Sequence, residues 1–214
     1  MAPNNNSPKG IKGFQVIKPD TLVIDIIQCI ESQLPLFVSS SEFTDITKIK
    51  KNENQHSAAF CIYLNYNCLN RFCFIRESSQ KGSSTIDIGV YSGPKLIFTI
   101  EAKVLPTPKG NSKNPRPEHE YVYGKGAGIQ RFKKNKHGLD DQNNLLPENG
   151  MIAYIKEHDF EHWHTQINQW ISDTSWPDTE LLQKVYFNIT AKLISKHTRQ
   201  DNSNVILHHF WVNV

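Results

Sequence analysis

Three charged residues lie in two neighbouring segments that otherwise alternate in the manner of β-strands. In the segment 85–91, Asp87 lies on the face opposite the branched apolar residues. In the segment 95–105, Glu101 and Lys103 lie two residues apart on the face opposite the apolar one. The Ser-Gly-Pro-Lys turn between the segments predicts an antiparallel hairpin, which can bring Asp87 beside the other two. Such a trio is costly to bury unless its members pair or bind a metal ion.

These side chains are suited to phosphodiester hydrolysis. Two carboxylates on adjacent strands can bind one or two Mg²⁺ ions through oxygen atoms, with water completing the coordination shell. A metal ion lowers the pKa of bound water and neutralises the charge that grows on a phosphate. We expect Asp87 and Glu101 to be metal ligands, with Mg²⁺ or Mn²⁺ as the ion, and Lys103 to orient the attacking water. A Glu-x-Lys pair by itself is also common on protein surfaces.

The order of the surrounding elements is more specific than the pair. Asp87, a short turn, a strand ending in Ile100-Glu-Ala-Lys103 and a glycine-led basic helix together resemble the PD-(D/E)XK nuclease superfamily. The resemblance covers about residues 19–155, with isoleucine before Asp87 in place of the superfamily's proline. It implies an α/β fold with a central mixed sheet flanked by helices, a restriction-endonuclease-like core. It also implies catalytic roles for Asp87, Glu101 and Lys103.

The same resemblance suggests further site residues. Many superfamily members carry an extra acid on the first core helix, where Glu31 is the candidate, and Glu77 is a second candidate just before the second strand. Some relatives place a glutamine on the helix after the Glu-x-Lys strand, and Gln130 occupies that sort of position, with Lys134 one turn further along. The alternative for each of these residues is an ordinary polar side chain on a solvated surface.

The charges are separated along the chain. The net charge is +3, but residues 106–137 carry eight Lys and Arg against two Glu, and residues 138–180 carry one Lys against nine Asp and Glu. A basic segment suits a polyanionic partner, and we expect that partner to be DNA. A solvated loop without a ligand is the alternative. The residues expected to contact the nucleic acid are Lys125, Gln130, Arg131, Lys133, Lys134 and Lys136.

The apolar pattern predicts the elements that position these residues. A helix is expected over 19–34, with Asp20 as its N-cap and Pro35 as its end. Residues 56–69 are apolar without clear periodicity and fit either a helix or a strand. Strands are expected over 71–76, 85–91, 95–105, 151–155 and 204–213, and helices over 129–136 and 158–172. Residues 180–189 remain ambiguous.

Cysteine and histidine patterns favour no further site. The four cysteines, Cys29, Cys61, Cys68 and Cys73, form no CxxC pair, and we expect reduced, buried thiols. His158 and His162 share a helix face, but the surrounding sequence lacks the HExxH order and a distant third ligand. The Gly124-Lys-Gly-Ala-Gly128 segment does not fit a P-loop.

Length and composition limit the classes of protein. A chain of 214 residues with 38% apolar and 21% charged residues is typical of a globular protein. Its start has no apolar signal region, and no run approaches the roughly 18 apolar residues of a membrane span. We expect a disordered tail over 1–18 and one domain over 19–214, with the core ending near residue 155 and a C-terminal elaboration over 156–214. The expected location is cytoplasmic, without membrane contact.

The most concrete expectation is a Mg²⁺-dependent endonuclease that acts on DNA, an activity that superfamily members often use in restriction or in defence against phages and plasmids. Two alternatives remain open. One is a catalytically silent nucleic-acid-binding or scaffold subunit that keeps the nuclease fold, and the other is a ribonuclease. Cutting both strands would need two active sites, so a homodimer or larger complex is also an expectation.

Overall fold

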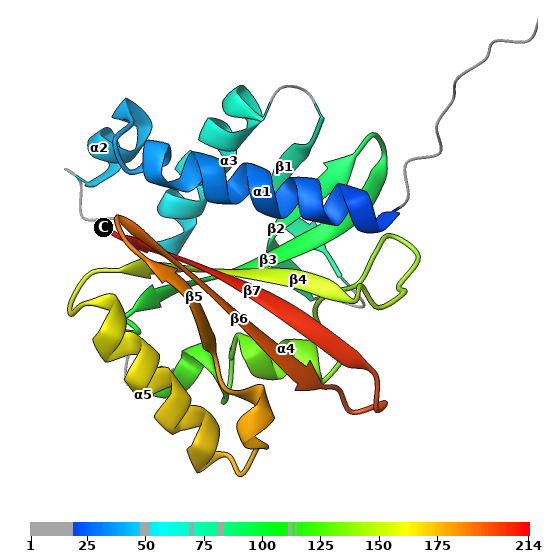
Figure 1. Ribbon diagram of the computed structural model, residues 1–214, viewed down its shortest axis with the longest axis vertical. Coiled ribbons are helices and arrows are strands. Elements are labelled where there is room, and N and C mark those ends of the chain that lie inside the picture. The colour runs from blue at the N-terminus through cyan, green and yellow to red at the C-terminus, as the bar shows by residue number, and fades with distance from the viewer. Residues whose placement is uncertain (1–18, 48–51, 69–70, 81–83, 111–112, 114) are drawn as a thin grey trace, which may run out of the picture.

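The computed structural model describes residues 19–47, 52–68, 71–80, 84–110, 113 and 115–214. Over these ranges the fold is α/β, and a seven-stranded mixed sheet runs through its centre with helices on both faces (Figure 1). This confirms the α/β class and the central mixed sheet flanked by helices that were expected from the sequence. The expected tail, residues 1–18, lies outside the described residues.

The sheet has the strand order β1-β2-β3-β4-β7-β6-β5. Strands β1 to β3 form an antiparallel meander, β3, β4 and β7 are parallel, and β7, β6 and β5 are antiparallel. The strands are β1 (Cys73–Ser79), β2 (Thr85–Ser92), β3 (Lys95–Leu105), β4 (Glu148–Ile155), β5 (Gln183–Phe187), β6 (Thr190–Thr198) and β7 (Asn204–Asn213). The C-terminal elaboration therefore extends the same sheet on the far side of β4.

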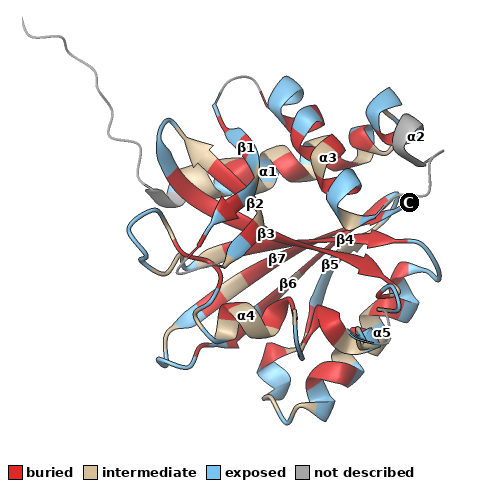
Figure 2. Cartoon of the chain, turned by 180° about the vertical axis from the view of Figure 1, so that it is seen from behind, coloured by how far each residue is buried: buried red, intermediate tan, exposed pale blue. Residues whose placement is uncertain are grey.

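Two helical layers cover the sheet. The helices α1 (Pro19–Phe37), α2 (Ser41–Thr47) and α3 (Glu53–Asn67) lie on one face, and α4 (Ile129–Lys133) and α5 (Phe160–Asp173) lie on the other (Figure 1). Two 3₁₀ turns, η1 (Glu118–Tyr121) and η2 (Asp178–Glu180), connect elements of the second layer. The inner strands β3, β4 and β7 and the sheet-facing sides of the helices are mostly buried, whereas the edge strands β1 and β5 are largely not (Figure 2), and each face of the sheet has its own apolar core.

The expected alternation along β3 is confirmed. Phe98, Ile100, Ala102 and Val104 pack in the core beneath the first helical layer. Because successive side chains of a strand point to opposite faces, Glu101 and Lys103 are directed away from that core. The expected β2–β3 hairpin is also present, with antiparallel pairing.

The first helix does not end at Pro35, as the sequence suggested, but continues to Phe37. Proline removes only one hydrogen-bond donor so near the end of a helix. Leu34 and Phe37 are both fully buried, and their packing stabilises the last turn. The helix begins at Pro19, so Asp20 is inside it, and the side chain of Asp20 lies outside the described residues.

Several elements were ambiguous or absent in the sequence reading. The segment 56–69 forms most of α3, which begins with a capping box in which Asn52 and Gln55 each accept from the other's backbone N–H. The helix α2 and the strand β6 were not predicted, and β5 falls in the ambiguous stretch 180–189. These elements are short or lack a clean period, and tertiary packing determines their form.

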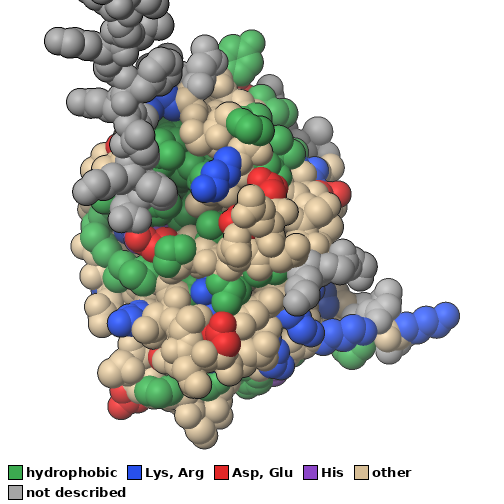
Figure 3. Space-filling model, turned by 90° about the vertical axis from the view of Figure 1, so that its right-hand side faces the viewer, with side chains coloured by type: hydrophobic (Ala, Val, Ile, Leu, Met, Phe, Trp, Pro, Cys, Tyr) green, Lys and Arg blue, Asp and Glu red, His purple; other side chains and the backbone are tan. Residues whose placement is uncertain are grey.

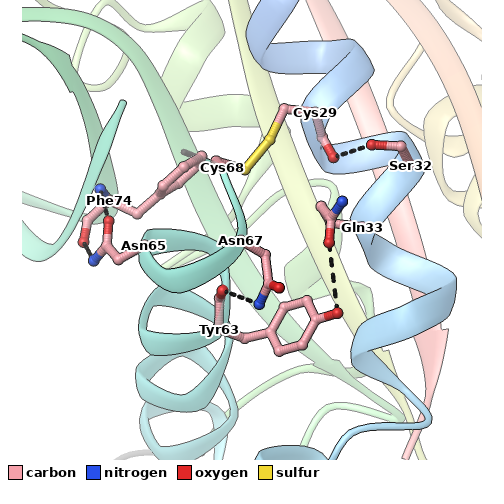
Figure 4. The surroundings of a disulfide bond; sticks show 8 residues. All are labelled: Cys29, Ser32, Gln33, Tyr63, Asn65, Asn67, Cys68 and Phe74. Carbon is pink, nitrogen blue, oxygen red and sulfur yellow. Dashed lines mark hydrogen bonds between the residues drawn. A yellow bond between two sulfur atoms is a disulfide. The ribbon is translucent and has the colours of Figure 1, made fainter. Parts of the chain in front are cut away.

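The expectation of four reduced thiols is wrong. Cys29 of α1 and Cys68 at the end of α3 form a disulfide, and Ser32 and Tyr63 make hydrogen bonds beside it (Figure 4). The link joins the two helices across a sequence separation of 39 residues. Cys61 is a buried free thiol, but Cys73 is exposed.

No helix in the described ranges is both long enough and apolar enough to cross a membrane.

Candidate active site

Asp87 lies where the β2–β3 hairpin separates. The pairing of the two strands runs from Ser92 and Lys95 to Ile88 and Ile100. Asp87 is the residue before Ile88 in β2, and its Oδ2 atom accepts a hydrogen bond of 2.7 Å from the backbone N–H of Ala102. The carboxylate thus takes the place of a strand partner, which fixes it beside the middle of β3.

Glu101 and Lys103 form a buried ion pair on β3. The Lys103 Nζ donates to Glu101 Oε1 at 2.6 Å, and the two side chains are only 5% and 2% exposed. The structure therefore brings together the three charged residues singled out in the sequence, Asp87, Glu101 and Lys103.

The electrostatics of the three groups differ. Burial and the nearby Glu101 carboxylate raise the pKa of Asp87 to about 8, against a smaller opposing effect of Lys103. Burial alone would raise the pKa of Glu101, but Lys103 and His137 lower it to about 2. Burial would lower the pKa of Lys103, but Glu101, Glu53 and Asp87 raise it above its usual value. Lys103 is therefore a permanent cation, and Asp87 is the acid that holds a proton near neutral pH.

His137 and Arg131 hold the other side of Glu101. His137 is fully buried, and its Nδ1 lies 3.1 Å from Glu101 Oε2. Arg131, on α4, places NH1 3.5 Å from Glu101 Oε1 and 3.4 Å from His137 Nε2. Because a guanidinium only donates, His137 accepts at Nε2 and carries its proton at Nδ1. Arg131 was predicted to contact nucleic acid, and His137 was missed because no motif marks it.

Glu53 is a fourth charged residue of the cluster, and the sequence reading missed it. It lies in the first turn of α3, and its charge contributes to the raised pKa of Lys103. Burial raises the pKa of Glu53 itself, although Lys103 and Arg116 oppose the shift. Its Oε2 is buried and accepts no hydrogen bond from the described residues, and the nearest guanidinium atom, on Arg116, is 4.0 Å away. Arg116 is held by two hydrogen bonds to Glu120.

The two acids proposed from the resemblance lie elsewhere. Glu31 pairs with Lys192 of β6 at 2.8 Å, in the layer between α1 and the sheet. Glu77 is exposed and pairs with its neighbour Arg76 at 2.9 Å. The further acid near the cluster is Glu53, on the helix that directly precedes the β1–β2–β3 meander.

The basic residues predicted to contact nucleic acid divide into two groups. Lys125, Lys134 and Lys136 are exposed. Lys133 pairs with Glu180, and its Nζ lies 4.4 Å from the centre of the Trp176 ring. Lys133 is therefore part of the internal packing. Figure 3 shows Lys and Arg side chains gathered along one edge of the face drawn there, next to residues whose placement is not described.

Gln130 is half-buried on α4 and faces the glycine-rich segment that leads into this helix. Its Oε1 accepts a hydrogen bond of 3.3 Å from the backbone N–H of Gly124. Lys134 lies just beyond the last residue of α4, as its C-cap, and not within the helix as expected.

A buried hydrogen-bonded chain supports the elements behind the cluster. It runs from Tyr121 of η1 through His209, Ser195 and His197 to Glu180, with consecutive distances of 2.7, 2.7, 2.8 and 2.9 Å. Glu180 in turn holds Lys133 of α4. The chain thus connects η1, which carries Glu120, to α4, which carries Arg131.

The donors and acceptors in this chain have one consistent arrangement. The indole of Trp211 donates to the Tyr121 hydroxyl at 3.1 Å, so the hydroxyl donates to His209 Nδ1. Each later group then donates to the next, from His209 through Ser195 to His197 and Glu180. Ser195, His197 and Glu180 have the order of a nucleophile, base and acid, but all three are buried and do not face a substrate.

The donor set fits a divalent cation in its chemistry. Carboxylate oxygens are the ligands that Mg²⁺ and Mn²⁺ prefer; Glu53 Oε2 is buried without a hydrogen-bond donor, and burial raises the pKa of Asp87 despite the nearby Lys103. The described residues contain no group of three or more His, Cys, Asp or Glu already arranged to hold a metal ion. In this structure, Glu101 Oε1 accepts a hydrogen bond from Lys103 instead.

No family model, curated protein or solved structure matches the chain. The similarity to PD-(D/E)XK nucleases stays a prediction that depends on the residues and on their geometry.

Proposed function

We propose that the chain is a divalent-metal-dependent nuclease that hydrolyses phosphodiester bonds of DNA. The observation that carries the proposal is the buried cluster of Asp87, Glu101 and Lys103 at the separation of the β2–β3 hairpin. Burying these charges is costly, and a structural role alone would be filled equally well by apolar residues. Glu53 adds a third carboxylate from a different element.

In this proposal Asp87, Glu101 and Glu53 hold Mg²⁺ or Mn²⁺. The bound ion would supply an activated water molecule and neutralise charge on the phosphate. Lys103 acts through its charge, because the surrounding carboxylates keep it protonated. It stabilises the negative charge that develops on the phosphate oxygens in the transition state. Arg131, partly exposed and directed at Glu101, binds a non-bridging oxygen of the same phosphate.

The exposed residues Lys125, Lys134 and Lys136 supply sequence-independent contacts to the phosphate backbone. Action in restriction or in defence against phages and plasmids, assembly as a homodimer or larger complex, and a cytoplasmic location belong to the same proposal. The Cys29–Cys68 disulfide is a bond that is rare in reducing compartments.

One observation favours a second candidate, a silent nucleic-acid-binding or scaffold subunit. Glu101 Oε1 is held by Lys103 and Arg131, so a metal ion must displace one of these cations to bind that oxygen, while Oε2 accepts no hydrogen bond from the described residues although His137 Nδ1 lies 3.1 Å away. A scaffold would keep this arrangement permanently. A ribonuclease is the other alternative, and the same assay distinguishes it.

The test is single-turnover cleavage of circular, linear and single-stranded DNA and of RNA, with Mg²⁺, Mn²⁺ or EDTA. Wild type should cleave DNA only with metal. Lys103→Met, which keeps the length of the side chain, should lower the cleavage rate by about 100-fold or more, or about 2.7 kcal/mol of transition-state stabilisation. The matched control is Lys196→Met on β6, where the lysine is exposed.

Removing one partner of a buried ion pair can also unfold a protein, so a thermal melt accompanies each variant. If Lys103→Met does not fold, the double variant Glu101→Gln with Lys103→Met removes both charges and keeps the packing. Equal cleavage by wild type and a folded variant would show that the cluster is not the active site. Cleavage of RNA alone would establish the ribonuclease, and DNA binding without cleavage under either metal would establish the scaffold.

A further inference from the structure

A cavity of about 700 Å³ lies at the C-terminal ends of β3 and β4, and the proposed cleavage chemistry does not use it. Its size is within the range of roughly 300–1,000 Å³ that is typical of small-molecule sites. One wall is formed by Val104 and residues 106–109, which follow β3, and the other by residues 156–158 and the helix α5.

The cavity adjoins the charged cluster along the chain. Val104, in its wall, directly follows Lys103 in β3, although the two side chains point to opposite faces of the sheet. Glu118 also lines the cavity, and Glu120, two residues later, holds Arg116 at the edge of the cluster. The cavity and the cluster thus share β3 and the segment that contains Glu118 and Glu120, and a strand bound at the cluster is proposed to continue along them.

The lining contains aromatic rings and polar groups that can form hydrogen bonds with the edge of a planar ligand. Trp163 and Trp170 of α5 contribute the small exposed parts of their side chains to the lining. The rings of His158 and His162 stack with their centres 4.1 Å apart. Gln166 adds an amide, which both donates and accepts hydrogen bonds. Aromatic surfaces of this kind stack on nucleic-acid bases with little dependence on sequence, because every base has a π-face.

The charges of the lining select a base over a free anion. Lys109 and Lys156 contribute two positive charges, and Glu118 and Glu157 contribute two negative ones. A site with this balance does not concentrate phosphate ions, whereas the neutral base of a nucleotide enters it without an electrostatic penalty. The phosphates of the same strand remain at Lys103 and at the exposed lysines.

We propose that this cavity takes one unpaired base of the nucleic-acid strand that is cleaved. The proposal rests on the proposed nuclease function for the placement of the phosphate. A base inside a duplex must leave its stack and its partner before it can enter such a site. The chain therefore prefers single strands and unpaired strand ends to continuous duplex.

The experiment measures binding without cleavage. Fluorescence anisotropy in EDTA compares a labelled five-nucleotide thymidine strand with an abasic strand of the same length, which keeps the phosphates and lacks the bases. Wild type should bind the thymidine strand about tenfold more tightly. His162→Ala, at an exposed position of α5, should reduce this ratio to about threefold, and the cavity-filling Gln166→Trp should reduce it to about one.

The matched control is His119→Ala, because His119 stacks on Tyr123 and does not line the cavity. It should keep the tenfold ratio. If Gln166→Trp does not fold in a thermal melt, His162→Ala decides the result alone. Equal binding of the two strands by wild type, or a ratio unchanged by His162→Ala, would overturn the proposal.

The two proposals fail separately. Metal-dependent cleavage without a preference for the thymidine strand would leave the nuclease function standing and remove the base site. A preference that His162→Ala reduces, without cleavage under any metal, would support the base site and remove the nuclease function.

Discussion

The replacement Asp87→Asn tests the electrostatics of the cluster directly. Burial and the Glu101 carboxylate raise the pKa of Asp87 from its usual value of about 3.8 to about 8. The folded protein therefore holds a proton near neutral pH that the unfolded chain releases. Asparagine has no carboxyl group to ionise, and its amide oxygen can still accept the hydrogen bond from the backbone N–H of Ala102.

The sign and size of the effect follow from the two pKa values. Because the pKa is raised in the folded state, the stability from this group is complete below about pH 4 and is lost as the pH rises through about 8. Each pH unit in that window costs about 1.4 kcal/mol, so the upper bound of the loss at pH 7 is about 4 kcal/mol. Because asparagine does not ionise, Asp87→Asn does not lose this stability, and its free energy of unfolding at neutral pH should be higher than that of wild type.

The assay is urea unfolding followed by tryptophan fluorescence in EDTA, at about pH 5, 7 and 8.5. The gain in the free energy of unfolding should be small at the lowest pH, grow toward neutral pH and level off above about pH 8. The matched control is Asp178→Asn in η2, an exposed position where no such gain is expected. A gain that is equal at the three pH values, or no gain at any of them, would refute the reasoning.

The same two proteins test the metal assignment. A divalent cation stabilises the ionised form of Asp87, so Mg²⁺ or Mn²⁺ should raise the melting temperature of wild type more than that of Asp87→Asn. Calorimetry with Mn²⁺ should give weaker binding by the variant. Equal binding by both proteins would exclude Asp87 as a ligand.

Three further predictions concern the surroundings of the cluster. Cys29→Ser should lower the free energy of unfolding by about 4 kcal/mol, the loop-closure value for 39 residues, whereas Cys73→Ser, at a free and exposed cysteine, should leave urea unfolding unchanged. The double variant Arg131→Ala with Lys134→Ala should weaken DNA binding. It should also reduce the slope of the logarithm of the binding constant against the logarithm of salt concentration by about one unit per lost phosphate contact. An unchanged slope would show that these residues do not contact the DNA backbone. Ser195→Ala should cost about 2–3 kcal/mol in urea unfolding, because it leaves buried imidazole atoms without partners; a cost below about 0.5 kcal/mol would contradict the hydrogen-bonded chain.

The sequence could place the charged trio because strand periodicity is a local property. Side chains alternate with a period of two, so Glu101 and Lys103 had to share a face once β3 was recognised. A short turn made the hairpin, and with it the approach of Asp87, the simplest arrangement. The α/β class was expected from the resemblance of this order of elements to the PD-(D/E)XK superfamily, and the structure confirms the class.

Glu53 could not be found in the same way. The segment that became α3 has buried residues on several of its sides, among them His56, Ser57, Phe60 and Tyr63, so it lacks the apolar stripe of an amphipathic helix. The capping box of Asn52 and Gln55 was the one local signal for the start of a helix, and it would have placed Glu53 in the first turn. Its approach to Lys103 depends on how α3 packs on the sheet, which no local pattern encodes.

The basic segment shows a related limit. A count of charges along 106–137 treats all of its Lys and Arg alike, but the partner of Lys133 is Glu180, far along the chain. Arg116 is held by Glu120, four residues further along the chain. Pairing with acids makes such residues less available to a polyanion, and the exposed lysines of the segment remain: Lys109, Lys113, Lys125, Lys134 and Lys136.

The charge inventory of the cluster connects its stability to its proposed activity. Glu53, Asp87 and Glu101 contribute three carboxyl groups, and the cation buried among them is Lys103, with Arg131 at the edge. The metal-free protein accommodates this excess of acid by keeping a proton on Asp87, at the expense of stability as the pH rises. In the proposed metal-bound state, a divalent cation would remove the same repulsion by binding the ionised carboxylates. The pH dependence of Asp87→Asn in EDTA tests the buried carboxyl group whichever function holds, its change on addition of Mg²⁺ or Mn²⁺ tests the metal site, and cleavage of DNA separates the nuclease from the scaffold.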